Sequence, residues 1–96
     1  MYDIETTAEF DAWLAGIKDG KTQKVIVKRI RTMSTGTLGL VRSLDNGLFE
    51  AKIDYGPGYR LYFVNKGRKI IVLLCGGKKN AQESDIGKAA KMAKEI

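Results

Sequence analysis

The sequence predicts a small α+β domain in which a three-stranded antiparallel meander lies between two N-terminal helices and a final helix. Two runs, 48–55 and 59–64, alternate apolar and polar side chains, and Gly-Pro-Gly at 56–58 forms a turn between them. Residues 70–75 are apolar without alternation, which is typical of a central strand covered on both faces. Apolar residues between positions 10 and 33 recur every three or four residues instead, which indicates helices.

Length and charge set the bounds for function. The 96 residues are expected to form one domain, 1–96, and 44% of them are hydrophobic, enough for one core. The formal net charge is +6, and residues 21–44 hold six basic residues and no acidic one. Such a surplus suggests a polyanionic partner, either nucleic acid or an acidic protein, whereas the bland alternative is a charge that only keeps the protein in solution.

Residue content argues against several kinds of site. The chain has no histidine, which excludes a histidine-dependent triad, paired-histidine ribonuclease chemistry and histidine-ligated zinc. We therefore expect no metal and no cofactor. The single cysteine, Cys75, lies in the most apolar run and is predicted to be buried. Acidic residues near the N-terminus argue against a signal segment, and no apolar run approaches the ~20 residues of a membrane span. We expect a cytoplasmic protein with no membrane partner.

The first two elements are a short strand and a helix. Tyr2 and Ile4 at period two predict a strand within 1–5. Thr6-x-x-Glu9 has the form of a capping box, and apolar residues follow it at helical spacing: Phe10, Trp13, Leu14 and Ile17. We expect Trp13 to be part of the core and the helix to end at Asp19-Gly20.

A second helix is predicted over 21–34, with Ile26, Ile30 and Met33 on one face. Basic residues recur nearly opposite that face: Lys21, Lys24, Lys28 and Arg31. An ordinary surface helix mixes the signs of its charges, so the lack of any acid favours docking on nucleic-acid phosphates over a merely solvated face. Residues 35–44, which include Arg42 as a further candidate RNA contact, are expected to form a crossing loop, and Asp45-Asn46-Gly47 a turn.

The meander predicts which polar side chains share a face. If Tyr55 pairs with Tyr59 across a three-residue loop, Asp54 lies opposite Arg60, and Lys52 lies opposite Tyr62 on the same face. Glu50 points to that face as well. Tyr62 is then a candidate to stack on an RNA base, with sheet packing as the alternative.

The end of the last strand carries a second cationic feature. Lys78 and Lys79 follow Gly76-Gly77 and precede Asn80-x-x-Glu83, a capping-box pattern that begins a final helix. Cations at a helix N-terminus oppose the helix dipole, so we interpret them as contacts for an anion.

Residues 44–63 and 73–86 resemble the toxins of the RelE/ParE superfamily, and within it the HigB-like group of addiction module killer proteins. The resemblance is carried by Asp-Tyr-Gly-Pro-Gly-Tyr-Arg at 54–60 and by Gly-Gly-x-Lys-x-x-Gln at 76–82. It implies a RelE-like fold, β-α-α-β-β-β-α, with a small antiparallel sheet and two N-terminal helices packed on one face. It also implies a type II toxin held inactive by a cognate antitoxin, which we expect to be of the helix-turn-helix type. Many such toxins are ribosome-dependent endoribonucleases that cut mRNA.

Carried over by position, the catalytic cations of these toxins fall on Lys52, Arg60 and Lys79, with Lys78 as an alternative for the last. Arg60 stays protonated and suits stabilisation of the phosphorane, whereas Lys52 is expected to assist proton transfer. Glu50 and Asp54 are auxiliary candidates. Glu50 would hold the cations or act as an acid–base group, and Asp54 would pair with Arg60 across the strands.

Two departures from the resemblance leave alternatives open. Some members carry a basic residue where this chain has Glu50, and some carry a C-terminal tyrosine, whereas no tyrosine follows Tyr62 here. One alternative is a toxin of the same superfamily that acts on DNA gyrase. The other is a basic binding partner without catalytic activity.

Overall fold

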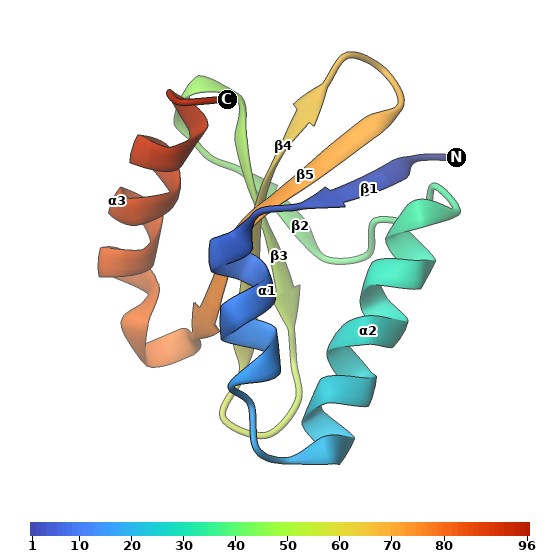
Figure 1. The fold of residues 1–96 in the computed structure, drawn as a ribbon, viewed down its shortest axis with the longest axis vertical. Coiled ribbons are helices and arrows are strands. Elements are labelled where there is room, and N and C mark those ends of the chain that lie inside the picture. Colours follow the sequence, from blue (N-terminus) through green and yellow to red (C-terminus); the bar gives the residue numbers. More distant parts are fainter.

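The computed structural model describes all 96 residues, which form a five-stranded sheet with helices on both faces (Figure 1). In chain order the elements are β1 (Asp3–Thr6), α1 (Ala8–Ala15), α2 (Gly20–Ser34), β2 (Val41–Ser43), β3 (Leu48–Ile53), β4 (Tyr59–Lys66), β5 (Ile70–Lys78) and α3 (Gln82–Ala93). Short 3₁₀ turns at Asp45–Gly47 and Lys79–Ala81 precede β3 and α3. The predicted α+β class is confirmed. None of the helices combines the length and the apolar character that crossing a membrane requires.

The sheet has the strand order β1-β5-β4-β3-β2. The predicted meander forms from β3, β4 and β5, which pair antiparallel. Two features differ from the prediction. The first strand pairs parallel with β5, so the sheet is mixed and not wholly antiparallel. The segment 35–44, predicted to be a loop, contributes the short edge strand β2, which pairs with β3.

Each face of the sheet is covered by a separate apolar cluster. Phe10 of α1 and Ile26 and Met33 of α2 pack on the face formed by the odd-numbered residues of β3 and β4, such as Ala51 and Leu61. Ala89 of α3 packs on the opposite face. Cys75 lies under α3 and is buried, as the sequence predicts. The two N-terminal helices therefore share one face and α3 covers the other, which leaves β5 buried on both faces.

The helix boundaries follow caps that differ from those predicted. Thr7, not Thr6, caps α1 and accepts a hydrogen bond from the N–H of Phe10 (3.0 Å). Asp19 does not end α1 but caps α2, because its carboxylate accepts from the N–H of Lys21 at 3.2 Å. The capping box predicted at Asn80 does not form: the 3₁₀ turn occupies that position, and no side chain caps α3.

The pairing of β3 with β4 is shifted by two residues from the predicted one. Ile53 pairs with Tyr59 and Lys52 pairs with Arg60, so the connecting loop runs from Asp54 to Gly58. The N–H of Gly58 donates to the carbonyl of Tyr55 (2.9 Å), which closes a turn inside this longer loop. Because the shift is even, the same side chains still share a face, but their partners change.

The strand β5 extends through Gly76-Gly77 to Lys78, beyond residue 75, where the predicted strand ends. A Cβ on Gly76 would lie 2.4 Å from the ring of Trp13, and a Cβ on Gly77 would overlap the carboxylate of Asp85. The absence of side chains at these two positions therefore lets α1 and α3 approach the sheet closely from opposite sides.

Candidate functional site

The fold brings Lys52, Arg60 and Lys79 together. Lys52 of β3 and Arg60 of β4 are directly paired, and Lys79 follows the end of β5. All three line one hollow of about 130 Å³, whose remaining wall is formed mainly by the 54–58 loop. The three predicted catalytic cations thus lie around a single small space.

The position of Lys79 is fixed by its backbone. Its N–H donates to the carbonyl of Gly58 (2.9 Å), and its side-chain stem lies where a Cβ on Gly58 would be only 3.3 Å away. Lys78, the last residue of β5, lines a different hollow, with Trp13 and Tyr59. Of the two lysines, the structure therefore places Lys79, and not Lys78, beside Lys52 and Arg60.

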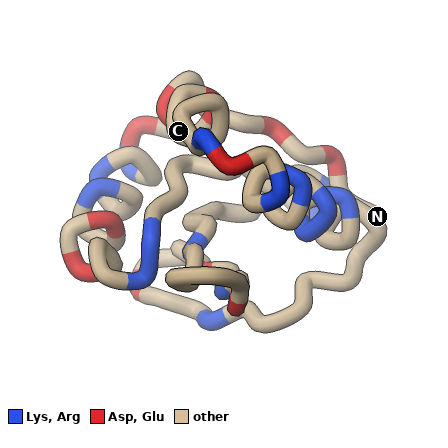
Figure 2. The backbone as a smooth tube through the Cα atoms, turned by 90° about the horizontal axis from the view of Figure 1, so that it is seen from below, with Lys and Arg blue, Asp and Glu red and all other residues tan.

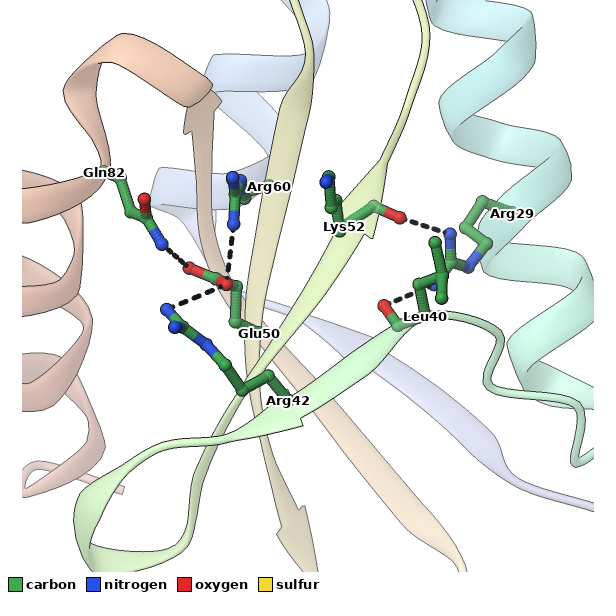
Figure 3. Close-up of polar contacts among 7 residues, drawn as sticks. All are labelled: Arg29, Leu40, Arg42, Glu50, Lys52, Arg60 and Gln82. Atoms are coloured by element: carbon green, nitrogen blue, oxygen red, sulfur yellow. Dashed lines mark hydrogen bonds and ion pairs between the residues drawn. The ribbon is translucent and has the colours of Figure 1, made fainter.

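A buried carboxylate orients Arg60 (Figure 3). Glu50 of β3 is only 2% exposed, and its Oε1 accepts a hydrogen bond from Nη1 of Arg60 at 2.8 Å. Nη2 of Arg42 on β2 lies 3.2 Å from the same oxygen, and Nε2 of Gln82 donates to Oε2 at 2.8 Å. Both oxygens of Glu50 are thus bound, by groups from three different elements. Glu50 occupies the position to hold the cations, which is one of its two predicted roles.

A second hollow, of about 280 Å³, adjoins the first. It shares Lys52 and Arg60 with the first hollow, and its other lining residues are Leu40, Val41, Arg42 and Glu50. Val41 and Arg42 belong to β2, and Leu40 directly precedes it. This side of the site therefore depends on a strand that the sequence does not predict.

Arg29 fixes the backbone around the second hollow. Its guanidinium donates to the carbonyls of Leu38 (2.8 Å), Leu40 (3.0 Å) and Lys52 (2.6 Å), which joins α2 to the 38–40 segment and to β3 (Figure 3). Burial lowers the pKa of Arg29. Gly39 has a φ of +74° and would place a Cβ 2.9 Å from this guanidinium. No local sequence pattern marks this role of Arg29, because its partners are backbone carbonyls of residues distant in the sequence.

Two predicted site residues lie elsewhere than expected. Tyr62 is fully buried between the sheet and α3, so the prediction that its ring stacks on an RNA base is wrong. Burial, and next the charge of Glu50, raise the pKa of Tyr62 well above its usual value. Asp54 does not pair with Arg60, whose carboxylate partner is Glu50. It lies instead in the 54–58 loop, among the residues that line the smaller hollow.

The basic stripe of α2 is exposed and contains Lys21, Lys24, Lys28 and Arg31. Figure 2 shows basic residues gathered along α2, whereas α3 carries both signs of charge. No carboxylate pairs with the stripe, since the three ion pairs of the chain involve Arg42, Arg60 and Lys88. The stripe is therefore an unneutralised cationic surface.

Asp85, in the first turn of α3, is a polar group without a partner. Its Oδ2 is buried and accepts no hydrogen bond, and the hydroxyl of Tyr62 is also buried and unpaired. Burial raises the pKa of Asp85, which the nearby charge of Lys88 partly offsets. Lys88 itself forms an ion pair with Glu9 of α1 at 2.7 Å.

Comparison with known proteins places the chain in a family. No family model matches the chain. A protein of Haemophilus influenzae described as uncharacterized is 40% identical over 93 residues, which cover 97% of this chain and 94% of the relative. A chain of the crystal structure of the E. coli DinJ–YafQ complex superposes with a TM-score of 0.65 at 19% identity, covering 84% of this chain and 97% of that one. The chain therefore belongs to one family with the Haemophilus influenzae protein, and its fold is RelE-like.

Proposed function

We propose that the chain is the toxin of a type II toxin–antitoxin module, of the HigB-like group, and that it cleaves mRNA on the ribosome. The observation that carries this proposal is the meeting of Lys52, Arg60 and Lys79 around one hollow of about 130 Å³. Three cations around a small space suit the phosphodiester of a nucleic-acid backbone. The RelE-like fold and the two-protein DinJ–YafQ assembly support a partner protein that acts as antitoxin. Action on ribosomes would take place in the cytoplasm.

The proposed chemistry is a transesterification that needs no metal. The 2′-oxygen of one ribose attacks the adjacent phosphorus, the bond from phosphorus to the 5′-oxygen breaks, and the products are a 2′,3′-cyclic phosphate and a 5′-hydroxyl. Arg60 keeps its charge and, with one donor held by Glu50, directs further N–H donors at the phosphorane. Its fixed orientation means that little reorganisation is needed when negative charge develops.

Proton transfer is assigned to the other groups in the same hollow. Asp54 is the one carboxylate that lines it, and an ionised carboxylate accepts a proton from the 2′-hydroxyl. Lys52 and Lys79 carry N–H donors, and either can protonate the departing 5′-oxygen. In this assignment Lys52 assists the reaction by donating a proton to the departing 5′-oxygen, and not by accepting one from the 2′-hydroxyl.

The test is expression of the chain alone from a tightly controlled promoter, with mapping of mRNA 5′ ends. The wild type is expected to arrest growth and to cut messages within translated regions. Lys52→Ala should reduce cutting about a hundredfold, the usual scale for loss of a group that transfers a proton. Lys66→Ala is the matched control, since Lys66 is also an exposed lysine of the sheet but lies outside both hollows.

Two other results would contradict the proposal. Arrested growth with intact mRNA and blocked DNA supercoiling would identify a gyrase inhibitor. Harmless accumulation of the folded chain would identify a binding partner without catalytic activity. Lys52 is exposed, so a loss of cutting in Lys52→Ala is not expected to reflect unfolding, and circular dichroism of the purified variant checks this.

A further inference from the structure

We infer that the second hollow is a nucleoside subsite, in which Leu40 contacts the base next to the scissile phosphate. The inference rests on the proposed function and adds to it the part of the substrate that the cations do not reach. Lys52 and Arg60 line both hollows, whereas Leu40 lines the second hollow alone and Lys79 the first. A phosphate held at this shared wall therefore places one of its two nucleosides toward Leu40.

The first argument is the exposure of Leu40. Its exposed fraction is 65%, and the only more exposed large apolar residue is Met1 at the chain terminus. An exposed leucine alone is ordinary, but this one lies beside a hollow lined by three basic side chains, those of Arg42, Lys52 and Arg60. An apolar surface next to cations matches a nucleotide, which has an apolar base and an anionic phosphate.

The second argument is that the backbone of Leu40 is held in place. Its carbonyl accepts hydrogen bonds from the N–H of Lys52 (2.9 Å) and from Nη2 of Arg29 (3.0 Å). The same guanidinium also binds the carbonyl of Lys52. Arg29 therefore sets the position of Leu40 relative to Lys52, and a contact surface that is fixed before binding loses little entropy when it binds.

The third argument concerns size and chemistry. The hollow of about 280 Å³ is close to the ~300 Å³ at the lower end of small-ligand sites, so it suits a group as small as one nucleoside. Glu50, the only acid in the lining, already has both oxygens bound by Arg60, Arg42 and Gln82. It is therefore less able to repel a phosphate than a free carboxylate would be.

The experiment compares cutting of one mRNA in a purified translation reaction by the wild type and by Leu40→Ser, with the rate and the flanking bases recorded at every cut. Loss of a base contact should slow cutting on the order of tenfold and flatten the preference for particular bases. Leu40→Met, which keeps an apolar side chain, should restore most of the rate. Ile96→Ser is the control, because it removes an exposed apolar side chain outside the site.

The outcomes separate this inference from the proposed function. If the wild type cuts and Leu40→Ser cuts equally fast with the same base preference, the subsite is wrong and the nuclease assignment stands. If the wild type cuts nothing, the proposed function fails and the subsite fails with it. If Leu40→Ser cuts normally but binds its antitoxin more weakly, Leu40 belongs to a protein-docking surface and the inference is overturned.

Discussion

Removing the carboxylate of Glu50 should destabilise the fold far more than removing the exposed cation that contacts it, Arg42. Glu50 is 2% exposed and Arg60 is 8% exposed, so the Glu50→Ala change leaves a buried guanidinium without its partner. Breaking a buried pair in this way costs about 3–5 kcal/mol. The Gln82 amide also loses its charged acceptor, a bond that is generally worth about 1.5–3 kcal/mol. These terms are not additive, and Arg60 lies near a hollow that admits water. We therefore expect the unfolding free energy to fall by about 3 kcal/mol.

Two further variants identify the cause of that loss. Glu50→Gln keeps the shape and one acceptor oxygen but removes the charge, so its cost should be about 1–2 kcal/mol. Arg42 contacts the same oxygen of Glu50, but its side chain is 59% exposed. Water replaces its lost interactions, and Arg42→Ala should cost less than about 1 kcal/mol.

Urea unfolding followed by the fluorescence of Trp13 measures all three variants, since this ring packs against Gly76 of β5 and reports on the sheet. The slope of free energy against urea should stay constant, which shows that the variants unfold from the same compact state. A loss below about 0.5 kcal/mol for Glu50→Ala would refute the reasoning, because it would mean that water replaces the carboxylate at no cost.

Three further predictions concern other parts of the chain. Lys24→Glu combined with Lys28→Glu should weaken ribosome binding and lower its dependence on salt. The same two charge changes at Lys91 and Lys94, at the C-terminal end of α3, should have less effect, and equal effects would show that the α2 stripe is not a specific docking surface. Burial raises the pKa of Cys75 to about 11, so a thiol reagent should modify it at neutral pH only after denaturation, and rapid labelling of the folded chain would contradict its burial. Burial also raises the pKa of Asp85, so the folded state binds the proton of this carboxyl more tightly than the unfolded state does. The stability that the group contributes is therefore complete below its unfolded pKa near 3.8 and is lost as pH rises through the folded pKa. The stability of Asp85→Asn relative to the wild type should increase over that pH range, and a difference that does not change with pH would argue against the shift.

The faces of the meander could be predicted from sequence, but its pairing could not. Alternation at period two determines which side chains share a face, and Lys52 and Arg60 do share one. Pairing depends on the length of the loop, and Gly-Pro-Gly at 56–58 fits a three-residue loop as well as the observed five-residue one from Asp54 to Gly58. Because the observed pairing is shifted by two residues, the carboxylate partner of Arg60 is Glu50 and not Asp54.

The second hollow could not be predicted, because the signals that form it are not local. The strand β2 has three residues, too few to show a period. Arg29 lies off the apolar face of α2 like any surface cation, and its role depends on carbonyls that lie 9 to 23 residues further along the chain. The role of Gln82 depends likewise on Glu50, which lies 32 residues away.

Glu50 is one of the two departures from the toxins that the sequence resembles, some of which carry a basic residue at this position. A further cation would strengthen the field of the hollow but would leave Arg60 without an acceptor that fixes its orientation. The carboxylate of Glu50 lowers the positive charge of the site, but it holds the guanidinium of Arg60 in place. Contacts from Arg42 and Gln82 fix the carboxylate in turn, so groups from three elements meet at Glu50. Preorganised donors stabilise a developing charge better than mobile ones do, because they need no reorganisation during the reaction. On this argument Glu50 is a positioning residue, and its presence is compatible with the proposed nuclease activity.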